Sequence, residues 1–328
     1  ARSMTRFFSR RELEPTRLDA TVEWFREGAP QRAGSGPAFA AAEGANLVMV
    51  QVESLQNFVI GLEIGGQEIT PFLNDWTEHG LWFSSVTDQT GHGRSSDSEL
   101  STQVSLLPMD GGAAAFRYAG NDFVGLAEAL AERGYRTLSA VPYDGAFWNR
   151  RRTHPAFGYQ QSLFVDDFEA GQNIGWGLSD RDFLEQAAGV VLGADKPIAA
   201  YLLTLSLHHP FHGFPPHLKE LDVGAWEGTP FGNFLHTMRF FDSSLAAFMA
   251  ILERQGMADN TVIAIWGDHD AGFVWRPEIA EAMGTTFDAA GWYLSQEVPL
   301  FIRVPTAESL WGERTVPAGH ADVAPTLL

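Results

Sequence analysis

The stretch NLVMVQV, residues 46–52, is an apolar run whose length suits one buried β-strand. Four further runs of the same kind follow it along the chain: YRTLSAV (135–141), PIAAYLLTLSL (197–207), TVIAIWG (261–267) and VPLFIRV (298–304). Strands that are apolar throughout, and do not alternate with polar residues, are typical of sheets buried on both faces. We therefore predict an α/β fold with a mostly parallel central sheet flanked by helices on both faces.

Helical patterns separate these strands, as a parallel sheet requires. Apolar side chains recur at helical spacing in residues 234–252. Residues 122–132 and 179–192 are also predicted to be helical. Thr70 and Pro71 mark the start of a short helix, because proline is favoured at the first helical position.

Residues 1–45 are predicted to precede the sheet as a lead-in. A short helix is expected near residues 18–26, and the segment after it is rich in glycine and alanine, as linkers are. No segment approaches the ~20 apolar residues that a membrane span needs. The predicted organisation is an N-terminal lead-in and linker over 1–45 and one large domain over 46–328. The chain stops directly after APTLL, so a C-terminal part of that domain could be missing.

The composition excludes several classes of protein. Lys and Arg number 22 against 41 Asp and Glu, which gives a net charge of −19. The chain therefore offers no basic stripe for a nucleic-acid backbone, and we expect no nucleic-acid partner. It contains no cysteine, which excludes disulfides, thiolate metal sites and a cysteine nucleophile. Small anionic substrates stay open, since a few arginines or a metal ion can override the overall charge locally.

Acidic and histidine side chains follow three of the predicted strands. Glu53 comes directly after the first strand, Asp268 and His269 follow another, and His208 and His209 follow a third. The carboxyl ends of parallel strands meet at one edge of a sheet, where such folds place their chemistry. Carboxylates and an imidazole brought together there suit a divalent cation. Each segment alone could simply meet solvent, but the three together predict a metal site.

The turn GHGRSSDSE, residues 91–99, combines hydroxyls, a cation and carboxylates. Ser96 and Glu99 match the Ser-x-x-Glu capping box that opens many helices. That interpretation does not require Ser95 or Arg94. A serine ahead of a helix and next to a divalent metal could act as a nucleophile. The helix amides and Arg94 would then receive a transferring phosphoryl group.

Nine short motifs across residues 46–328 resemble, in their order and spacing, the lipoteichoic acid synthase branch of the alkaline phosphatase and sulfatase superfamily. They are VESLQNFVIG, EITPFLN, QTGHGRSSDSE, FWNR, FGY, HHPF, RFFDSSL, DNTVIAIWGDH and GHADVAPTLL. The resemblance implies a nucleophilic Ser95 and one divalent metal, commonly manganese, whose ligands would be Glu53, Ser95, Asp268 and His269. It also implies that a glycerophosphate group is held by Trp148, Arg150 and His208.

The chain departs from this family's pattern at four positions. Ser95 stands where the synthases have threonine, which keeps the hydroxyl, and Arg94 replaces a lysine. Gln51 stands where they carry a histidine two residues before the metal glutamate. Their His-Gly-Asp is missing from VPYDGAFWNR, although Asp144 could substitute after a shift of one residue. We expect Gln51 and Asp144 to face the substrate in place of the family's residues.

Two rival chemistries of the superfamily fit less well. Formylglycine sulfatases need Pro or Ala two residues after the modified Cys or Ser, and Asp97 stands there. Two-zinc phosphatases need a second Asp/His/His set. Asp242 is available for it, but Ala246 occupies the place expected for its histidine, so Asp242 is interpreted as a helix-packing residue. One metal is therefore predicted.

Several other residues have ordinary structural interpretations. His79, His154 and His236 are expected to be helix or surface histidines, whereas His320 could equally face the substrate. Trp148 could pack in the core, with Arg150 paired to one of the many acids. We favour the substrate-binding role for both because FWNR follows a strand and matches the family.

The sequence predicts a metal-dependent phosphoglycerol transferase or phosphodiesterase that forms a phosphoserine at Ser95, with His208 protonating the leaving group. Mn²⁺ is the expected metal, with Mg²⁺, Ca²⁺ or Zn²⁺ as alternatives. The expected donor is a phospholipid such as phosphatidylglycerol, and the acceptor a glycan, a growing glycerophosphate chain or water. The resemblance implies an extracytoplasmic domain of a membrane-anchored protein. The alternatives are a phosphonate or phosphate ester hydrolase and a catalytically silent module that binds head groups or glycans.

Overall fold

The protein divides into two compact units, Ala1–Glu43 and Gly44–Leu328. The structure, a computed structural model, describes residues 15–27, 38–109, 111–305 and 307–328. In the first unit, helix α2 (Pro15–Glu27) contains the helix predicted near residues 18–26. None of the helices within the described ranges is long and apolar enough to cross a membrane.

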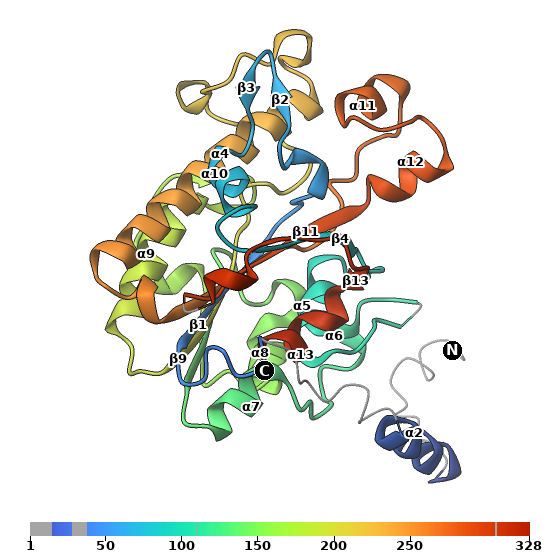
Figure 1. The fold of residues 1–328 in the computed structure, drawn as a ribbon, viewed down its shortest axis with the longest axis vertical. Coiled ribbons are helices and arrows are strands. Elements are labelled where there is room, and N and C mark those ends of the chain that lie inside the picture. The colour runs from blue at the N-terminus through green and yellow to red at the C-terminus, as the bar shows by residue number, and fades with distance from the viewer. Residues whose placement is uncertain (1–14, 28–37, 110, 306) are drawn as a thin grey trace. The chain divides into compact units, whose positions relative to one another are not determined.

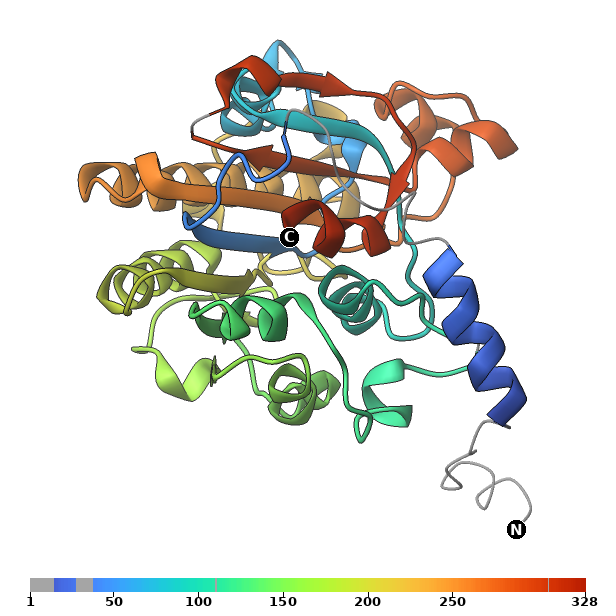
Figure 2. The ribbon, with the colours of Figure 1, turned by 60° about the horizontal axis from the view of Figure 1, so that its bottom comes forward.

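The second unit is built on a nine-stranded mixed sheet. Its strands lie in the order β12-β4-β11-β10-β1-β9-β5-β6, and β13 pairs with β4. Figure 2 shows this order, with the C-terminal strands above and β1 and β9 below. The strands are β1 (Asn46–Val52), β4 (Leu81–Thr87), β5 (Arg136–Ala140), β6 (Gln161–Leu163), β9 (Ile198–Leu203), β10 (Thr261–Gly267), β11 (Glu297–Arg303), β12 (Gly312–Arg314) and β13 (Ala318–Gly319).

The strands that carry the predicted site are parallel neighbours. β1 lies in the centre, with β10 parallel on one side and β9 parallel on the other. β5 and β6 continue the parallel run, whereas β11 is antiparallel to both β10 and β4. Two small hairpins lie outside this sheet: β2 (Glu63–Ile64) with β3 (Gln67–Glu68), and β7 (Asn173–Ile174) with β8 (Gly177–Leu178). The prediction of a mostly parallel central sheet is confirmed.

Helices cover both faces of the sheet, as predicted (Figure 1). On β1, Val48, Val50 and Val52 pack into one core with the apolar sides of α4, α9 and α10. Leu47 and Met49 point the other way, into a second core shared with α5, α7 and α13. The two cores follow from the two-residue period of a strand. The helices of this unit are α4 (Pro71–Trp76), α5 (Ser95–Val104), α6 (Ala114–Arg117), α7 (Leu126–Glu132), α8 (Arg150–Ala156), α9 (Asp180–Gly193), α10 (Pro230–Arg254), α11 (Pro277–Ala282), α12 (Ala289–Leu294) and α13 (Val323–Leu327).

Strand β4 was not predicted from the sequence. Its segment LWFSSVT has two serines in the middle, which interrupt the apolar run. Ser85 Oγ donates to Glu297 Oε1 at 2.9 Å, and Ser84 Oγ donates to Glu313 Oε1 at 2.6 Å. Both acceptors come from strands that follow more than two hundred residues later. Distant C-terminal partners, and not local hydrophobicity, therefore define this strand.

Asp242 has the structural role that was predicted for it. From α10 its carboxylate accepts the backbone N–H groups of Phe72 and Leu73, both at 2.9 Å, in the first turn of α4. The hydroxyl of Thr70, the residue before this helix, donates instead to Val59 O. Asp242 is thus the N-terminal cap of α4, and this use gives no support to a second metal there.

Candidate active site and metal centre

Four side chains of the predicted site meet at the carboxyl edge of the sheet. Glu53 follows β1, and Asp268 and His269 follow its parallel neighbour β10. Ser95 is the first residue of α5. All four are buried, with exposed fractions of 5% or less. The structure therefore brings together, over more than two hundred residues of sequence, the four groups that the sequence singled out.

The distances within this cluster are short and mutual. Ser95 Oγ lies 3.2 Å from Glu53 Oε2 and 3.2 Å from His269 Nε2. His269 Nε2 also lies 3.5 Å from Glu53 Oε1 and 3.4 Å from Asp268 Oδ2. One ligand atom from each of Glu53, Asp268 and His269 lies within 4.8 Å of the other two. Ligand atoms that surround a single metal ion have this spacing.

The chemistry of the cluster fits a divalent cation. Asp268 Oδ1 accepts the N–H of Ser54 at 2.8 Å, but Asp268 Oδ2 is buried without a hydrogen-bond partner. Burial, together with the nearby charge of Glu53, raises the pKa of Asp268 to about 7. Two buried carboxylates repel each other, and a cation between them would remove both the repulsion and the orphaned oxygen.

His269 is oriented to present Nε2 to the cluster. Its Nδ1 lies 2.8 Å from the carbonyl oxygen of Asp270, a backbone acceptor that places the ring proton on Nδ1. Nε2 then carries a lone pair and can bind a metal. Arg94 Nη2 approaches the same Nδ1 at 3.0 Å. Since both nitrogens would carry hydrogen, that approach is a contact, and Arg94 Nη2 donates to Asp270 O at 2.6 Å instead.

A sequence profile of the sulfatase family matches residues 45–328. The chain belongs to the sulfatase family. It is 31% identical over 299 residues to the lipoteichoic acid synthase-like YvgJ of Bacillus subtilis, covering 88% of this chain and 48% of the relative. It is 30% identical to lipoteichoic acid synthase 1 of the same organism, covering 88% of this chain and 46% of that protein. The chain thus spans about half the length of the curated relatives it matches.

Solved structures share the fold of this sulfatase-family chain. The lipoteichoic acid synthase LtaP from Listeria monocytogenes superimposes with a TM-score of 0.84 at 24% identity, over 92% of this chain and 76% of that one. The Streptococcus pyogenes phosphoglycerol transferase GacH, in complex with sn-glycerol-1-phosphate, gives a TM-score of 0.63 at 14% identity, over 87% and 76% of the two chains. At these identities the comparison confirms the alkaline phosphatase/sulfatase-like fold.

The turn before Ser95 in this sulfatase-family domain is organised by Asp97. Its Oδ2 accepts the N–H groups of Gly91 at 3.1 Å and Gly93 at 2.8 Å. A Cβ at Gly93 would lie 2.2 Å from Asp97 Oδ1, so the close approach requires glycine. Arg94 then adopts φ 43° and ψ −119°, a conformation that a non-glycine residue rarely accepts. The strained backbone lies directly before Ser95, as is common at functional sites.

The predicted capping box is wrong. Ser96 Oγ donates to Gly93 O at 2.8 Å, and the Glu99 side chain turns away from the helix start. The amides of Ser96 and Asp97 already donate to the carbonyls of Gly93 and Arg94. The start of α5 is therefore stabilised by the turn itself, and these two amides are not free for a phosphoryl group.

Glu99 instead anchors α5 to α8 through a buried ion pair. Its Oε1 accepts from Arg150 Nε at 2.9 Å and from Arg150 Nη2 at 2.7 Å. Its Oε2 lies 2.8 Å from His154 Nε2, and His154 Nδ1 lies 2.8 Å from Ser139 Oγ. Burial alone would raise the pKa of Glu99, but Arg150 and His154 outweigh it and the net shift is downward. Glu99 is thus ionised, and the sequence had not assigned it this role.

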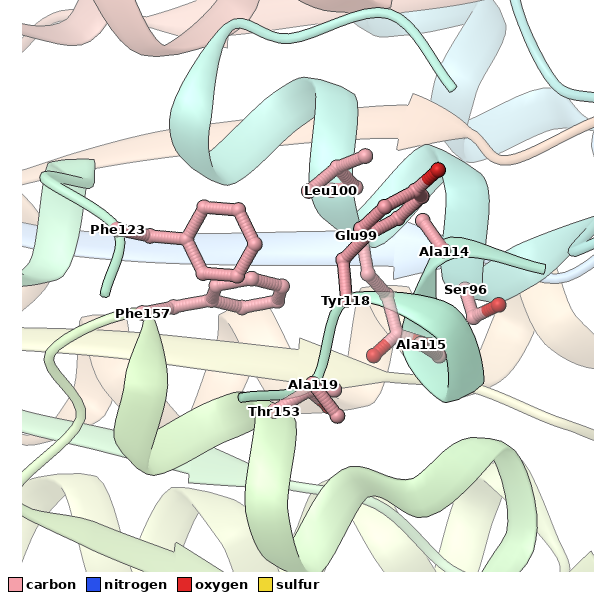
Figure 3. A pocket seen from close by; sticks show the side chains of 10 residues that line it. All are labelled: Ser96, Glu99, Leu100, Ala114, Ala115, Tyr118, Ala119, Phe123, Thr153 and Phe157. Atoms are coloured by element: carbon pink, nitrogen blue, oxygen red, sulfur yellow. The ribbon is translucent and has the colours of Figure 1, made fainter. Parts of the chain in front are cut away.

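A narrow pocket lies beside Glu99 (Figure 3). It has room for about one water molecule. Its walls come from α5, α6, α8 and the segment before α7, and include Ser96, Leu100, Ala114, Phe123 and Phe157. The pocket lies along α5 and does not include Ser95 or the cluster of metal-ligand candidates.

The resemblance suggested Arg150 as a substrate residue, but its side chain is paired with an acid, which was the structural alternative. It is 1% exposed and paired with Glu99, while its Nη1 is buried without a partner. Trp148 is half-buried, with φ 52°, and packs against Phe116 and Phe147. Asp144 is exposed and accepts the N–H of Ala146 at 2.9 Å. The substrate contacts of all three stay predictions.

Gln51 and His320 are both used internally. Gln51 is fully buried; its Nε2 donates to Ser95 O at 3.3 Å, and its Oε1 accepts from Tyr201 OH at 2.7 Å. His320 is also fully buried, with Nδ1 accepting the N–H of Gln89 at 3.3 Å and Nε2 lying 2.9 Å from Gly267 O. These contacts support the backbone on either side of the cluster. They leave neither side chain turned toward solvent.

Arg94 and His208 are both partly exposed, and Arg94 contacts His269 of the cluster. Arg94 is 40% exposed at its side chain, and its Nη1 pairs with Asp270 Oδ2 at 2.7 Å. His208 is half-buried, stacks on Trp176 with ring centroids 4.0 Å apart, and has Nδ1 2.6 Å from His209 O. The sequence had missed Asp270, although the acid stands within the same GDHD segment as the predicted ligands.

Proposed function

We propose that this domain catalyses metal-dependent transfer of a glycerophosphate group from a phosphatidylglycerol-like diester through a phosphoserine at Ser95. One observation carries the proposal. Ser95 Oγ is held 3.2 Å from both Glu53 Oε2 and His269 Nε2, beside the unpartnered Asp268 Oδ2. A buried hydroxyl among two carboxylates and an imidazole supports a role for Ser95 as the nucleophile.

Glu53, Asp268, His269 and Ser95 would hold one divalent ion, for which we propose Mn²⁺, with Mg²⁺, Ca²⁺ or Zn²⁺ as alternatives. When bound, the ion would favour the ionised form of the serine hydroxyl and offset negative charge on the phosphoryl group. Among the described residues, Glu53, Asp268 and His269 are the group of His, Asp and Glu side chains arranged for a metal. This supports one metal per chain.

The chain's own residues would divide the remaining work. Ser95 Oγ attacks phosphorus in line with the bond to the leaving group, and its proton is directed at Glu53 Oε2. Arg94 is partly exposed beside the cluster and would face the equatorial oxygens, although Asp270 neutralises part of its charge. His208 would protonate the leaving alkoxide. Trp148 would form an apolar wall for the glycerol arm, and Arg150, buried against Glu99, would hold the segment that carries Trp148 in place.

We base the proposed donor, acceptor and cellular location on the relatives. Proteins named lipoteichoic acid synthase match 88% of this chain. We infer a phospholipid donor and an acceptor that is a glycan, a glycerophosphate chain or water. We also infer that the domain works outside the cytoplasm as part of a membrane-anchored protein, next to its lipid donor.

A phosphonate or phosphate ester hydrolase would use the same cluster with water as acceptor. A silent binding module would need neither the buried serine nor the orphaned carboxylate oxygen, so the cluster argues for an enzyme. A binding module would also have no reason to keep Asp268 Oδ2 buried without a hydrogen-bond partner.

The test is to trap the covalent intermediate. The purified domain is incubated with Mn²⁺ and phosphatidylglycerol vesicles without added acceptor, then digested and measured by mass spectrometry. We expect a glycerophosphate adduct on Ser95 and release of diacylglycerol, both lost with EDTA and restored by Mn²⁺. Turnover of Ser95→Ala should fall by at least ~10³-fold, as expected for removal of a nucleophile.

Ser101→Ala is the matched control, because Ser101 lies on the same helix and donates to Leu106 O, away from the cluster. Its turnover should stay within about twofold of the wild type. Product formation by Ser95→Ala within tenfold of the wild type would show that water attacks directly. An adduct that forms equally well in EDTA would remove the metal from the proposal.

A further inference from the structure

A strip of aromatic rings lies on the surface beside the nucleophile helix. It runs through Phe116, Trp148, Phe147, Trp176 and His208, with successive ring centroids 5.8, 5.4, 5.6 and 4.0 Å apart. We call this set the aromatic strip. Phe116 is 54% exposed and Trp176 is 43% exposed, and the other three are half-buried.

The aromatic strip is not part of the hydrophobic core. Within the described part of the chain, Phe116, Phe147, Trp148 and Trp176 belong to neither of the two large core clusters nor to the small third one. They pack on one another, and Phe147 and Trp176 also contact Tyr143 at the edge of the second core. Four large aromatic side chains that stay partly in water outside the core clusters are better explained by a ligand than by stability.

The strip lies beside helix α5, whose first residue is Ser95. Phe116 lies on α6, which contacts α5, and Asn149 Nδ2 ties this end together by donating to Ala115 O at 2.9 Å. Phe147 and Trp148, in the middle of the strip, lead directly into α8, whose Arg150 pairs with Glu99 on α5.

We propose that the aromatic strip binds pyranose rings of a neutral glycan, which is the acceptor of the transferred group. One face of a pyranose carries C–H bonds that stack on the negative face of an indole or phenyl ring. Exposed polar groups at the strip, among them His209, Arg151 and Asp144, can bond to sugar hydroxyls. The net charge of −19 disfavours a polyanionic chain as the occupant.

This inference rests on the proposed function and specifies its acceptor. A sugar hydroxyl on the strip would attack the phosphorus of the phosphoester at Ser95. An oxygen–phosphorus bond to the sugar forms as the bond between phosphorus and Ser95 Oγ breaks. His208, deprotonated after it protonated the lipid alkoxide, takes the proton of the sugar hydroxyl, and the proton first directed at Glu53 returns to Ser95 Oγ.

The experiment measures how the enzyme divides its product between sugar and water. The domain, with Mn²⁺ and phosphatidylglycerol vesicles, is given cellobiose, and glycerophosphoryl cellobiose and free glycerophosphate are quantified by mass spectrometry. We expect the ratio of transfer to hydrolysis to fall at least tenfold in Trp176→Ala and in Phe116→Ala. Trp176→Tyr should recover most of the ratio, because it keeps an aromatic face.

Trp292→Ala is the matched control. Trp292 is 41% exposed and packs edge-to-face on Trp275 at 5.5 Å, much as Trp176 packs on Phe147, but it lies on α12. Its ratio should equal that of the wild type. Phe116 lies at the opposite end of the strip from His208, so its variant separates loss of sugar binding from displacement of that histidine.

A second readout does not depend on catalysis. Saturation-transfer NMR should detect cellobiose on the wild type and on Trp292→Ala, and lose the signal with Trp176→Ala. An unchanged signal in Trp176→Ala, no signal on the wild type, or equal losses of transfer and hydrolysis in both strip variants would each overturn the glycan site. Absence of the Ser95 adduct would overturn the proposed function instead, while the NMR result would still decide the strip.

Discussion

Removal of the Glu99 carboxylate should destabilise the domain more than loss of any exposed ion pair. Glu99 and Arg150 are 2% and 1% exposed at their side chains, and two nitrogens of Arg150 donate to one oxygen of Glu99. Removing one partner of such a pair leaves a buried charge and costs about 3–5 kcal/mol. Since domains have about 5–15 kcal/mol of stability, Glu99→Ala should lower the melting temperature by roughly 10 °C.

The assay is urea unfolding of Glu99→Ala, Arg150→Gln and the double variant Glu99→Ala/Arg150→Gln. The double variant should lose less than the sum of its two single substitutions, because the groups act as a pair. Glu253→Gln is the control: its partner Arg303 is 3.5 Å away and the two side chains are 53% and 32% exposed, so at most ~1 kcal/mol is expected. A loss below 1 kcal/mol in Glu99→Ala would refute the reasoning.

The pH dependence gives an independent check on the same pair. Arg150 and His154 lower the pKa of Glu99 below its ordinary 4.5 despite burial. A carboxylate with a lowered pKa stabilises the folded state fully above its unfolded value and loses that contribution as pH falls below it. The stability advantage of the wild type over Glu99→Gln should therefore be constant above about pH 5 and shrink in more acidic buffer.

Three further outcomes are expected. Calorimetry should show one Mn²⁺ bound per wild-type chain, and at least ~100-fold weaker binding to Asp268→Asn. Even residues that only support a metal ligand affect affinity about 10–100-fold. Two zinc ions per chain by elemental analysis would contradict this. Gln51→Ala should lower turnover about tenfold with Mn²⁺ affinity retained, because Ser95 O loses its donor at 3.3 Å; equal loss of both would assign Gln51 to the metal site. Burial, opposed by the amides of α4, raises the pKa of Asp242 to about 7. As pH rises, the carboxyl therefore loses its proton at a lower pH in the unfolded chain than in the folded protein. Wild-type stability should fall as pH rises from about 4 to 7. Asp242→Asn should flatten that fall in thermal melts, and parallel pH profiles would show that Asp242 is ionised throughout.

The sequence by itself predicted the five strands at the centre of the sheet, but not β4, β6, β12 or β13, and it singled out the four side chains of the candidate metal site. An apolar run such as 46–52 indicates a strand buried on both faces, and its last residue must emerge at the carboxyl edge. Glu53, Asp268 and His269 were therefore predictable as neighbours once their strands were predicted to be parallel. Ser95 was predictable because its turn combines a hydroxyl with a helix start. All of these are local properties of the chain.

The partners of polar side chains inside the fold were decided only by the tertiary structure. Glu99 matches a capping box locally, but it pairs with an arginine 51 residues away, and Asp242 caps a helix 169 residues earlier in the chain. A local pattern fixes where a side chain emerges from its own element. Its partner depends on which elements pack together, and a buried charge takes the strongest partner that packing brings within reach.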